Sequence, residues 1–162
     1  MIEVREAEPE EWDEAGRVTA DAYREFARGA DWESYLDHLA DVRGRAERTT
    51  VLVALDGGRL VGSATLELAG RVEPGDDRAL RSGEAHIRMV GVDPAHRRRG
   101  VGRLLMEACE SRARAAGKTF VTLHTTGRMA AAHAMYETAG YERGPDRELG
   151  DGFVLLSYSK PL

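Results

Sequence analysis

The chain has 162 residues, of which 42% are hydrophobic and 31% are charged, and its net charge is −5. This composition excludes a disordered chain and predicts one globular domain, which we expect to span residues 1–162. The acidic balance argues against nucleic acid as a partner, because duplex binding depends on many cationic contacts with phosphates.

The N-terminal segment carries no targeting or membrane signal. Residues 1–12 are acidic and contain no apolar run, unlike a signal peptide or an anchor. No other stretch approaches the ~18 apolar residues that a membrane-spanning helix needs. We therefore expect a cytoplasmic protein that binds no membrane.

The first half of the chain is predicted to form strands and two helices. Residues 2–6 alternate apolar with charged side chains, as a strand does. Apolar residues recur at intervals of three and four over 10–28 and over 31–42, which predicts two amphipathic helices. Two apolar runs, 49–55 and 60–68, flank Asp-Gly-Gly and predict a hairpin.

The second half alternates strands with helices, after a charged segment over 69–83 that predicts a long loop. The predicted elements are a central strand over 84–92, a helix from 101, a strand over 119–125, a helix over 128–139, and closing strands over 141–148 and 152–159. This order predicts an α/β (α+β) fold with a mixed sheet flanked by helices.

The connection between the central strand and the next helix has the composition of an anion site. Gly100 and Gly102 carry no Cβ, so the backbone there can approach a bulky ligand. The start of the helix offers unpaired N–H groups and the positive end of its dipole. Four arginines add cationic donors: Arg97, Arg98, Arg99 and Arg103. We expect a pyrophosphate here, although an arginine run alone is more often a solvated cluster.

Two motifs together resemble a known family. Residues 92–102 carry R-x-x-G-x-G directly after V-x-P, which resembles the acyl-CoA loop of the GCN5-related N-acetyltransferase (GNAT) family. Residues 132–141, A-x-x-M-Y-x-x-x-G-Y, look like that family's helix with a tyrosine near the thioester sulfur. The resemblance implies a mostly antiparallel central sheet of about seven strands, flanked by about four helices, with acetyl-CoA as co-substrate.

The resemblance also implies where the cofactor binds. The diphosphate would bind at the glycine loop, and the pantetheine arm would run along the central strand where it splays from the next strand. The implied cofactor-binding residues are Val90, Gly91, Val92, Arg97, Arg98, Arg99, Gly100, Val101, Gly102 and Arg103. Tyr136 matches the family tyrosine that donates a proton to the departing thiolate, and the alternative is a tyrosine packed under the sheet.

The implied acceptor is a primary amine of a small molecule or a protein, attacking the thioester directly. An amine of pKa about 10.4 must lose its proton at neutral pH, at a cost of roughly 4.6 kcal/mol that a general base can largely offset. His86 falls where the histone-modifying branch of the family carries its glutamate base, and Glu84 is the second candidate. A structural histidine with no dedicated base is the alternative.

Other residues of the central strand are candidates for binding the acceptor. Glu84, His86, Arg88 and Val90 share one face of the strand if no bulge intervenes. Arg88 can hold a substrate carboxylate or serve as a salt-bridge partner. No histidine spacing suggests a metal site. A non-catalytic acyl-CoA sensor is the alternative to an enzyme. The sequence leaves the oligomeric state open between a monomer and a homodimer, since dimers through edge strands are frequent among the relatives.

Overall fold

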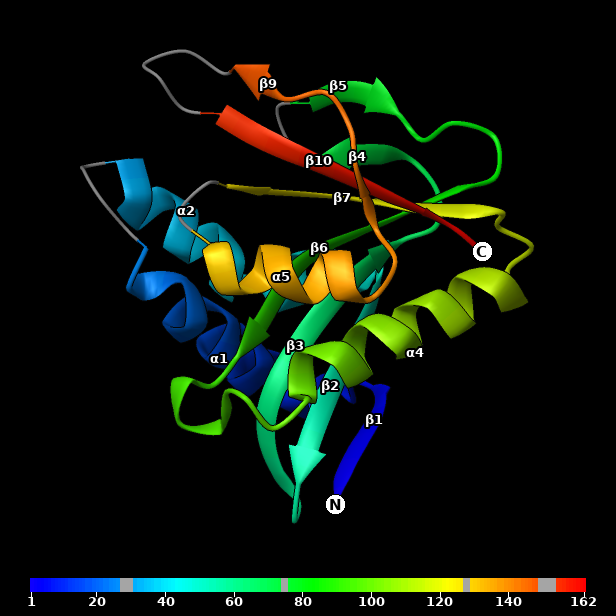
Figure 1. The fold of residues 1–162 in the computed structure, drawn as a ribbon. Coiled ribbons are helices and arrows are strands. Elements are labelled where there is room, and N and C mark those ends of the chain that lie inside the picture. The colour runs from blue at the N-terminus through cyan, green and yellow to red at the C-terminus, as the bar shows by residue number, and fades with distance from the viewer. Residues whose placement is uncertain (27–30, 74–75, 127–128, 149–153) are drawn as a thin grey trace.

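The computed structural model describes residues 1–26, 31–73, 76–126, 129–148 and 154–162 (Figure 1). Its helices are α1 (Trp12–Arg24), α2 (Asp31–Ala40), α3 (Val42–Ala46), α4 (Val101–Ala115) and α5 (Ala130–Thr138), with single 3-10 turns at Pro9–Glu11 and Pro94–His96. Its strands are β1 (Ile2–Glu6), β2 (Thr50–Asp56), β3 (Arg59–Glu67), β4 (Arg71–Glu73), β5 (Asp76–Ala79), β6 (Glu84–Val92), β7 (Phe120–Thr126), β8 (Glu142–Arg143), β9 (Arg147–Glu148) and β10 (Val154–Pro161).

Eight of these strands form one sheet in the order β1-β2-β3-β6-β7-β10-β8, with β9 also paired to β10. Every pairing in it is antiparallel except that of β6 with β7, which is parallel. The predicted mixed, mostly antiparallel sheet is therefore confirmed. The described residues contain five α-helices, where about four were expected.

The helices cover both faces of the sheet (Figure 1). Side chains alternate between the faces of a strand, so β2 contributes to two cores. Val51 and Val53 pack with α1 and α3, whereas Leu52 and Ala54 belong to the cluster that contains α4. Burial of both faces explains why residues 51–55 of β2 form a continuous apolar run. In the described part of the chain, no helix is long and apolar enough to cross a membrane.

The predicted helix over 31–42 is instead two helices. Asp41 leaves the helical conformation with φ −81° and ψ 62°, and its carboxylate accepts the Gly44 amide at 2.9 Å. An aspartate that caps the next helix competes with continuation of the preceding one. The break therefore separates α2 from α3. The predicted helix over 10–28 corresponds to α1, which ends at Arg24 and is preceded by the 3-10 turn at Pro9–Glu11. Residues 27 and 28 lie outside the described residues.

Two other expectations are corrected by the structure. The predicted loop over 69–83 contains the small β4–β5 hairpin, in which Arg71 pairs with Ala79. The closing strand predicted over 141–148 is reduced to two pairs of residues, β8 and β9, on either side of Gly144-Pro145. Proline has no N–H for a ladder hydrogen bond, which explains the interruption.

The central strand β6 carries a β-bulge. Its residues Met89 and Val90 lie opposite the single residue Ala64 of β3, and Met89 adopts φ 56°. A bulge reverses the alternation of faces beyond it. Val90 therefore packs with the α4 core, while His86 and Arg88 lie on the face covered by α1, α2 and α3. A bulge does intervene, so Val90 does not share the face of His86 and Arg88.

Candidate active site

The sheet opens between β6 and β7 along half of their length. The two strands pair in parallel only from Glu84 to Ile87, against Phe120 to Leu123. Beyond this point β7 stays paired to β10 through Thr126, whereas β6 stays paired to β3 through Val92. The β7-facing edge of the end of β6 is thus left for another extended group. Val90, Gly91 and Val92, predicted to bind a pantetheine arm, form this edge.

The glycine loop runs from the end of β6 to the start of α4. Gly100 is the N-cap of α4 and adopts φ 79°, a left-handed conformation that suits glycine. A Cβ at Gly100 would meet its nearest atom, Arg103 Nη2, at 3.7 Å, so space is open there. A Cβ at Gly102 would lie 3.0 Å from Met135 Sδ, so Gly102 also permits close packing of α4 on α5.

The arginines of the loop differ in their partners. Arg97 forms an ion pair with Glu25 and donates to the Ala22 carbonyl at 3.1 Å, so it fastens the loop to the end of α1. Arg99 lies 3.6 Å from Asp56, and Arg103 pairs with Glu107 at 2.8 Å. Arg98 adopts φ 65°, and no described residue forms an ion pair with it. These contacts place the cations around the N-terminus of α4.

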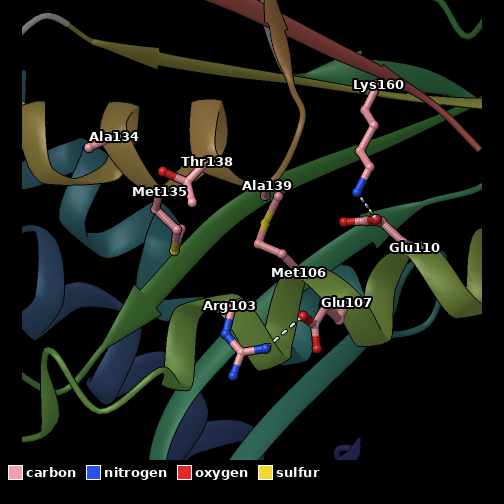
Figure 2. Close-up of a pocket in the computed structure, with 9 residues that line it drawn as sticks. All are labelled: Arg103, Met106, Glu107, Glu110, Ala134, Met135, Thr138, Ala139 and Lys160. Atoms are coloured by element: carbon pink, nitrogen blue, oxygen red, sulfur yellow. Dashed lines mark hydrogen bonds and ion pairs between the residues drawn. The ribbon is translucent and has the colours of Figure 1, made fainter.

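A pocket of about 420 Å³ lies between α4 and α5, next to the glycine loop (Figure 2). It is lined by Arg103, Met106, Glu107, Glu110, Ala134, Met135, Thr138, Ala139 and Lys160. Figure 2 shows Arg103 paired with Glu107 at one end and Lys160 paired with Glu110 at the other. Arg103 joins the pocket to the predicted anion site.

Tyr136 lies on α5 and is 6% exposed. Its ring packs against those of Tyr141 and Tyr158, with centroids 6.1 and 5.6 Å away. Burial, and after it the neighbouring Tyr158, raises the pKa of the Tyr136 phenol to about 12. The phenol therefore stays protonated at neutral pH and is available as a donor.

A chain of hydrogen bonds joins Glu84, Thr122 and His86 across the parallel pairing of β6 and β7. Thr122 Oγ1 lies 2.6 Å from Glu84 Oε2 and 2.8 Å from His86 Nδ1. All three residues are buried, and Glu84 and His86 are completely so. The contact of Nδ1 with Thr122 fixes the orientation of the imidazole.

Glu84 is saturated by donors. Arg78 binds both of its carboxylate oxygens, at 2.7 and 2.9 Å, and the Arg81 amide adds a bond of 2.9 Å. Burial alone would raise the pKa of Glu84, but these hydrogen bonds and that of Thr122 hold it well below its usual range. A carboxylate that is ionised and fully occupied makes a poor base, and it offers no surface to a substrate.

Arg88 lies on the same face as His86, and it is 4% exposed. Its Nη2 pairs with Glu67 Oε1 at 2.7 Å, across the pairing of β6 with β3. Burial raises the pKa of Glu67, against the opposing effect of the Arg88 charge. The predicted substrate residue is therefore inside the molecule, between the sheet and α2.

Comparison with known proteins identifies the family. The model of the acetyltransferase (GNAT) family matches residues 5–141. The chain belongs to the GNAT acetyltransferase family. A curated relative, an IAA acetyltransferase of Azospirillum brasilense, is 30% identical over 128 residues, which cover 78% of this chain and 77% of the relative. As a GNAT enzyme the protein is an N-acetyltransferase with acetyl-CoA as its co-substrate.

Solved structures confirm the GNAT fold. The structure of yncA from Salmonella typhimurium with its cofactor acetyl-CoA is 20% identical, has a TM-score of 0.71, and is covered over 93% of its length by 99% of this chain. The ribosomal-protein-S18-alanine N-acetyltransferase from Escherichia coli is also 20% identical, with a TM-score of 0.72 and coverage of 94% by 99% of this chain.

Sequence reasoning missed several residues that lie beside the candidate site residues Glu84, His86 and Arg88. Thr122, which links Glu84 to His86, was absent from the predicted site, although the pairing of the two predicted strands could have indicated it. Glu67 and Arg45 were also missed, because polar residues in a strand or helix are usually solvated. No signal in the sequence reveals that both are buried.

Proposed function

We propose that this GNAT enzyme moves the acetyl group of acetyl-CoA to a primary amine of a small molecule or a protein by direct attack. The observation that carries the proposal is the opening between β6 and β7, which ends at the glycine loop and the N-terminus of α4. An acyl-CoA combines an extended arm with a diphosphate. The opening offers a place for the arm, and the glycine loop with the N-terminus of α4 offers a place for the diphosphate. The cytoplasmic location and the homodimer stay predictions.

The free edge of β6 and the glycine loop each bind one part of the cofactor. Backbone groups of Val90, Gly91 and Val92 on the β7-facing edge pair with the pantetheine arm. The diphosphate binds to amides at the start of α4 and is surrounded by the cations of the loop. The residues that we assign to it are Arg98, Arg99, Gly100, Val101, Gly102 and Arg103, with Arg97 holding the loop against α1.

Tyr136 acts on the leaving sulfur as a hydrogen-bond donor. Its pKa of about 12 lies roughly 3.5 units above that of an ordinary thiol, so complete proton transfer to the thiolate would cost about 5 kcal/mol. A hydrogen bond to the developing thiolate avoids this cost and strengthens as the negative charge grows. We therefore assign stabilisation of the thiolate, rather than full protonation, to Tyr136.

His86 acts as the base, with its tautomer set by Thr122. The Thr122 hydroxyl has one proton, and the ionised Glu84 can only accept it. Thr122 Oγ1 must then accept from His86, so Nδ1 carries the imidazole proton and Nε2 carries the lone pair. Nε2 takes the proton of the ammonium, directly or through water. The neutral amine nitrogen then bonds to the acetyl carbon while the carbon–sulfur bond breaks, and the nitrogen loses its second proton to water, which leaves the amide and the CoA thiolate.

Release of CoA from acetyl-CoA in the presence of a panel of primary amines tests this proposal. We expect amine-dependent release by the wild type. Tyr136→Phe should lower kcat about 10- to 100-fold, because one hydrogen bond to a charged group is lost, with little change in the KM for acetyl-CoA. Because its raised pKa keeps the Tyr136 phenol protonated, titration of this group should not lower the activity of the wild type below about pH 10.

Two results would contradict this account. Full activity of the Tyr136→Phe enzyme would remove the role assigned to the phenol. Binding of acetyl-CoA without transfer to any amine would instead support a non-catalytic sensor. Glu142→Gln, an exposed change in β8, serves as the matched control because it alters no contact of the site.

A further inference from the structure

A cluster of buried charged residues lies on the α1–α2 face of the sheet, beside His86. Arg88 is two residues from His86 on β6, before the bulge, so the two side chains share a face. Arg45 of α3 is 2% exposed and Glu67 of β3 is 3% exposed. An acceptor that is bound at His86 and extends along β6 toward Arg88 would therefore reach this cluster.

The charges in this cluster do not balance. Glu67 pairs with Arg88, but Arg45 donates to neutral oxygens, at 3.2 Å to Thr65 Oγ1 and at 3.0 and 2.9 Å to the carbonyls of His38 and Leu39. Burial, and after it the positive charge of Arg88, lowers the pKa of Arg45 to about 10. Of these two buried guanidinium groups, only that of Arg88 has a carboxylate within hydrogen-bond distance, although buried cations are costly unless paired.

Arg88 also has donors that nothing in the described residues accepts. Its Nε and Nη1 are buried and have no hydrogen-bond partner there, and the same is true of His38 Nε2. Nearly all buried polar groups in proteins are hydrogen-bonded, and each exception costs about 1–3 kcal/mol. A ligand carboxylate would supply both the missing negative charge and the missing acceptor.

We propose that the acceptor carries a carboxylate and that Arg88 binds it while the amine lies at His86. This inference rests on the proposed function, because it takes His86 as the base. Residues two apart on a strand lie about 7 Å apart. The acceptor class is therefore a primary amine with a carboxylate several bonds away. His86 and both Arg88 donors are sealed from water in the free protein, so neighbouring side chains must move before an acceptor reaches them.

Binding is tested first, without any need for turnover. The probes are 5-aminopentanoate, 4-aminobutanoate and 3-aminopropanoate, each compared with its uncharged amide at constant ionic strength. We expect at least one acid to raise the Tm of the wild type more than its amide does. If no acid exceeds its amide, the proposal is overturned.

Three variants identify the residue that binds. Arg88→Lys keeps a cation for Glu67 but removes the guanidinium donors, and it should abolish the difference between acid and amide. Arg88→Met combined with Glu67→Leu removes the pair together, which avoids a lone buried charge and preserves folding. Arg17→Lys on the exposed face of α1 is the matched control and should retain the difference. A difference that survives both Arg88 variants overturns the proposal.

Turnover then separates this inference from the proposed function. In the wild type, we expect kcat/KM for the preferred acid to exceed that for its amide about 10- to 100-fold, as for one charge-assisted hydrogen bond. Arg88→Lys should remove this preference and leave the KM for acetyl-CoA unchanged. Equal turnover of acid and amide overturns the inference alone. Arg88-dependent binding of an acid with no acetylation of any amine contradicts the proposed function and leaves the carboxylate site standing.

Discussion

At the scale of single residues, the roles of Glu84 and His86 follow from their hydrogen-bond partners. Glu84 and His86 were both candidates for the base, and the sequence could not separate them. The arginines around Glu84 keep its carboxylate ionised, so it can only accept hydrogen bonds. Thr122 therefore donates to Glu84 and accepts from His86. Burial and neighbours decide such roles, and both depend on strands that are distant in the sequence.

Glu84→Gln tests this view of Glu84 through stability. An ionised carboxylate bound by arginines, an amide and a hydroxyl should stabilise the fold, and we expect the substitution to cost about 2–4 kcal/mol at pH 7. Because its pKa is lowered in the folded protein, this contribution is complete above the unfolded pKa of about 4.3 and is lost as the pH falls below it. Between pH 7 and pH 3.5 the difference from wild type should narrow by about 1 kcal/mol.

Denaturant unfolding at both pH values measures this difference. Glu3→Gln, an exposed carboxylate on β1, is the control and should change the free energy of unfolding little at either pH. A difference between Glu84→Gln and wild type that is independent of pH would show that Glu84 is not held ionised.

At the scale of elements, sequence patterns predicted some parts of the fold closely. The limits predicted for the central strand, 84–92, are those of β6, and Gly57-Gly58 forms the expected hairpin turn with φ values of 58° and 85°. These elements have strong local signals. The bulge at Met89 was not predicted, because it depends on the register with β3. The β4–β5 hairpin was missed because its charged residues resemble a solvated loop.

Close packing of α1 on α2 gives a prediction at this scale. A Cβ at Gly16 would lie 1.9 Å from the Ala40 carbonyl oxygen, so Gly16→Ala must push α2 away from α1. We expect a loss of about 1–3 kcal/mol in the free energy of unfolding, despite the better helix propensity of alanine. Glu14→Ala on the same helix is exposed and should change stability little. If Gly16→Ala were as stable as Glu14→Ala, the contact between the helices would be contradicted.

At the scale of the whole molecule, the sheet brings three regions together: the opening between β6 and β7, the glycine loop, and the buried face that carries His86 and Arg88. The opening beside β6 leads to the glycine loop at one end, while His86 and Arg88 lie on the opposite face from α4. The sequence motifs located the loop and the helix with Tyr136, but they gave no indication of the buried charges near α2. The fold therefore provides the frame for the cofactor, whereas the residues around Arg88 are the ones that we assign to the acceptor.

The most direct test of this account is a calorimetric titration with acetyl-CoA of the wild type, Gly100→Val and Gly117→Val. Both glycines adopt φ 79°, at opposite ends of α4, so valine strains the backbone equally while only Gly100 lies in the proposed diphosphate loop. We predict micromolar binding by the wild type and by Gly117→Val, and its loss in Gly100→Val. Equal binding by all three folded proteins would contradict the assignment of the glycine loop.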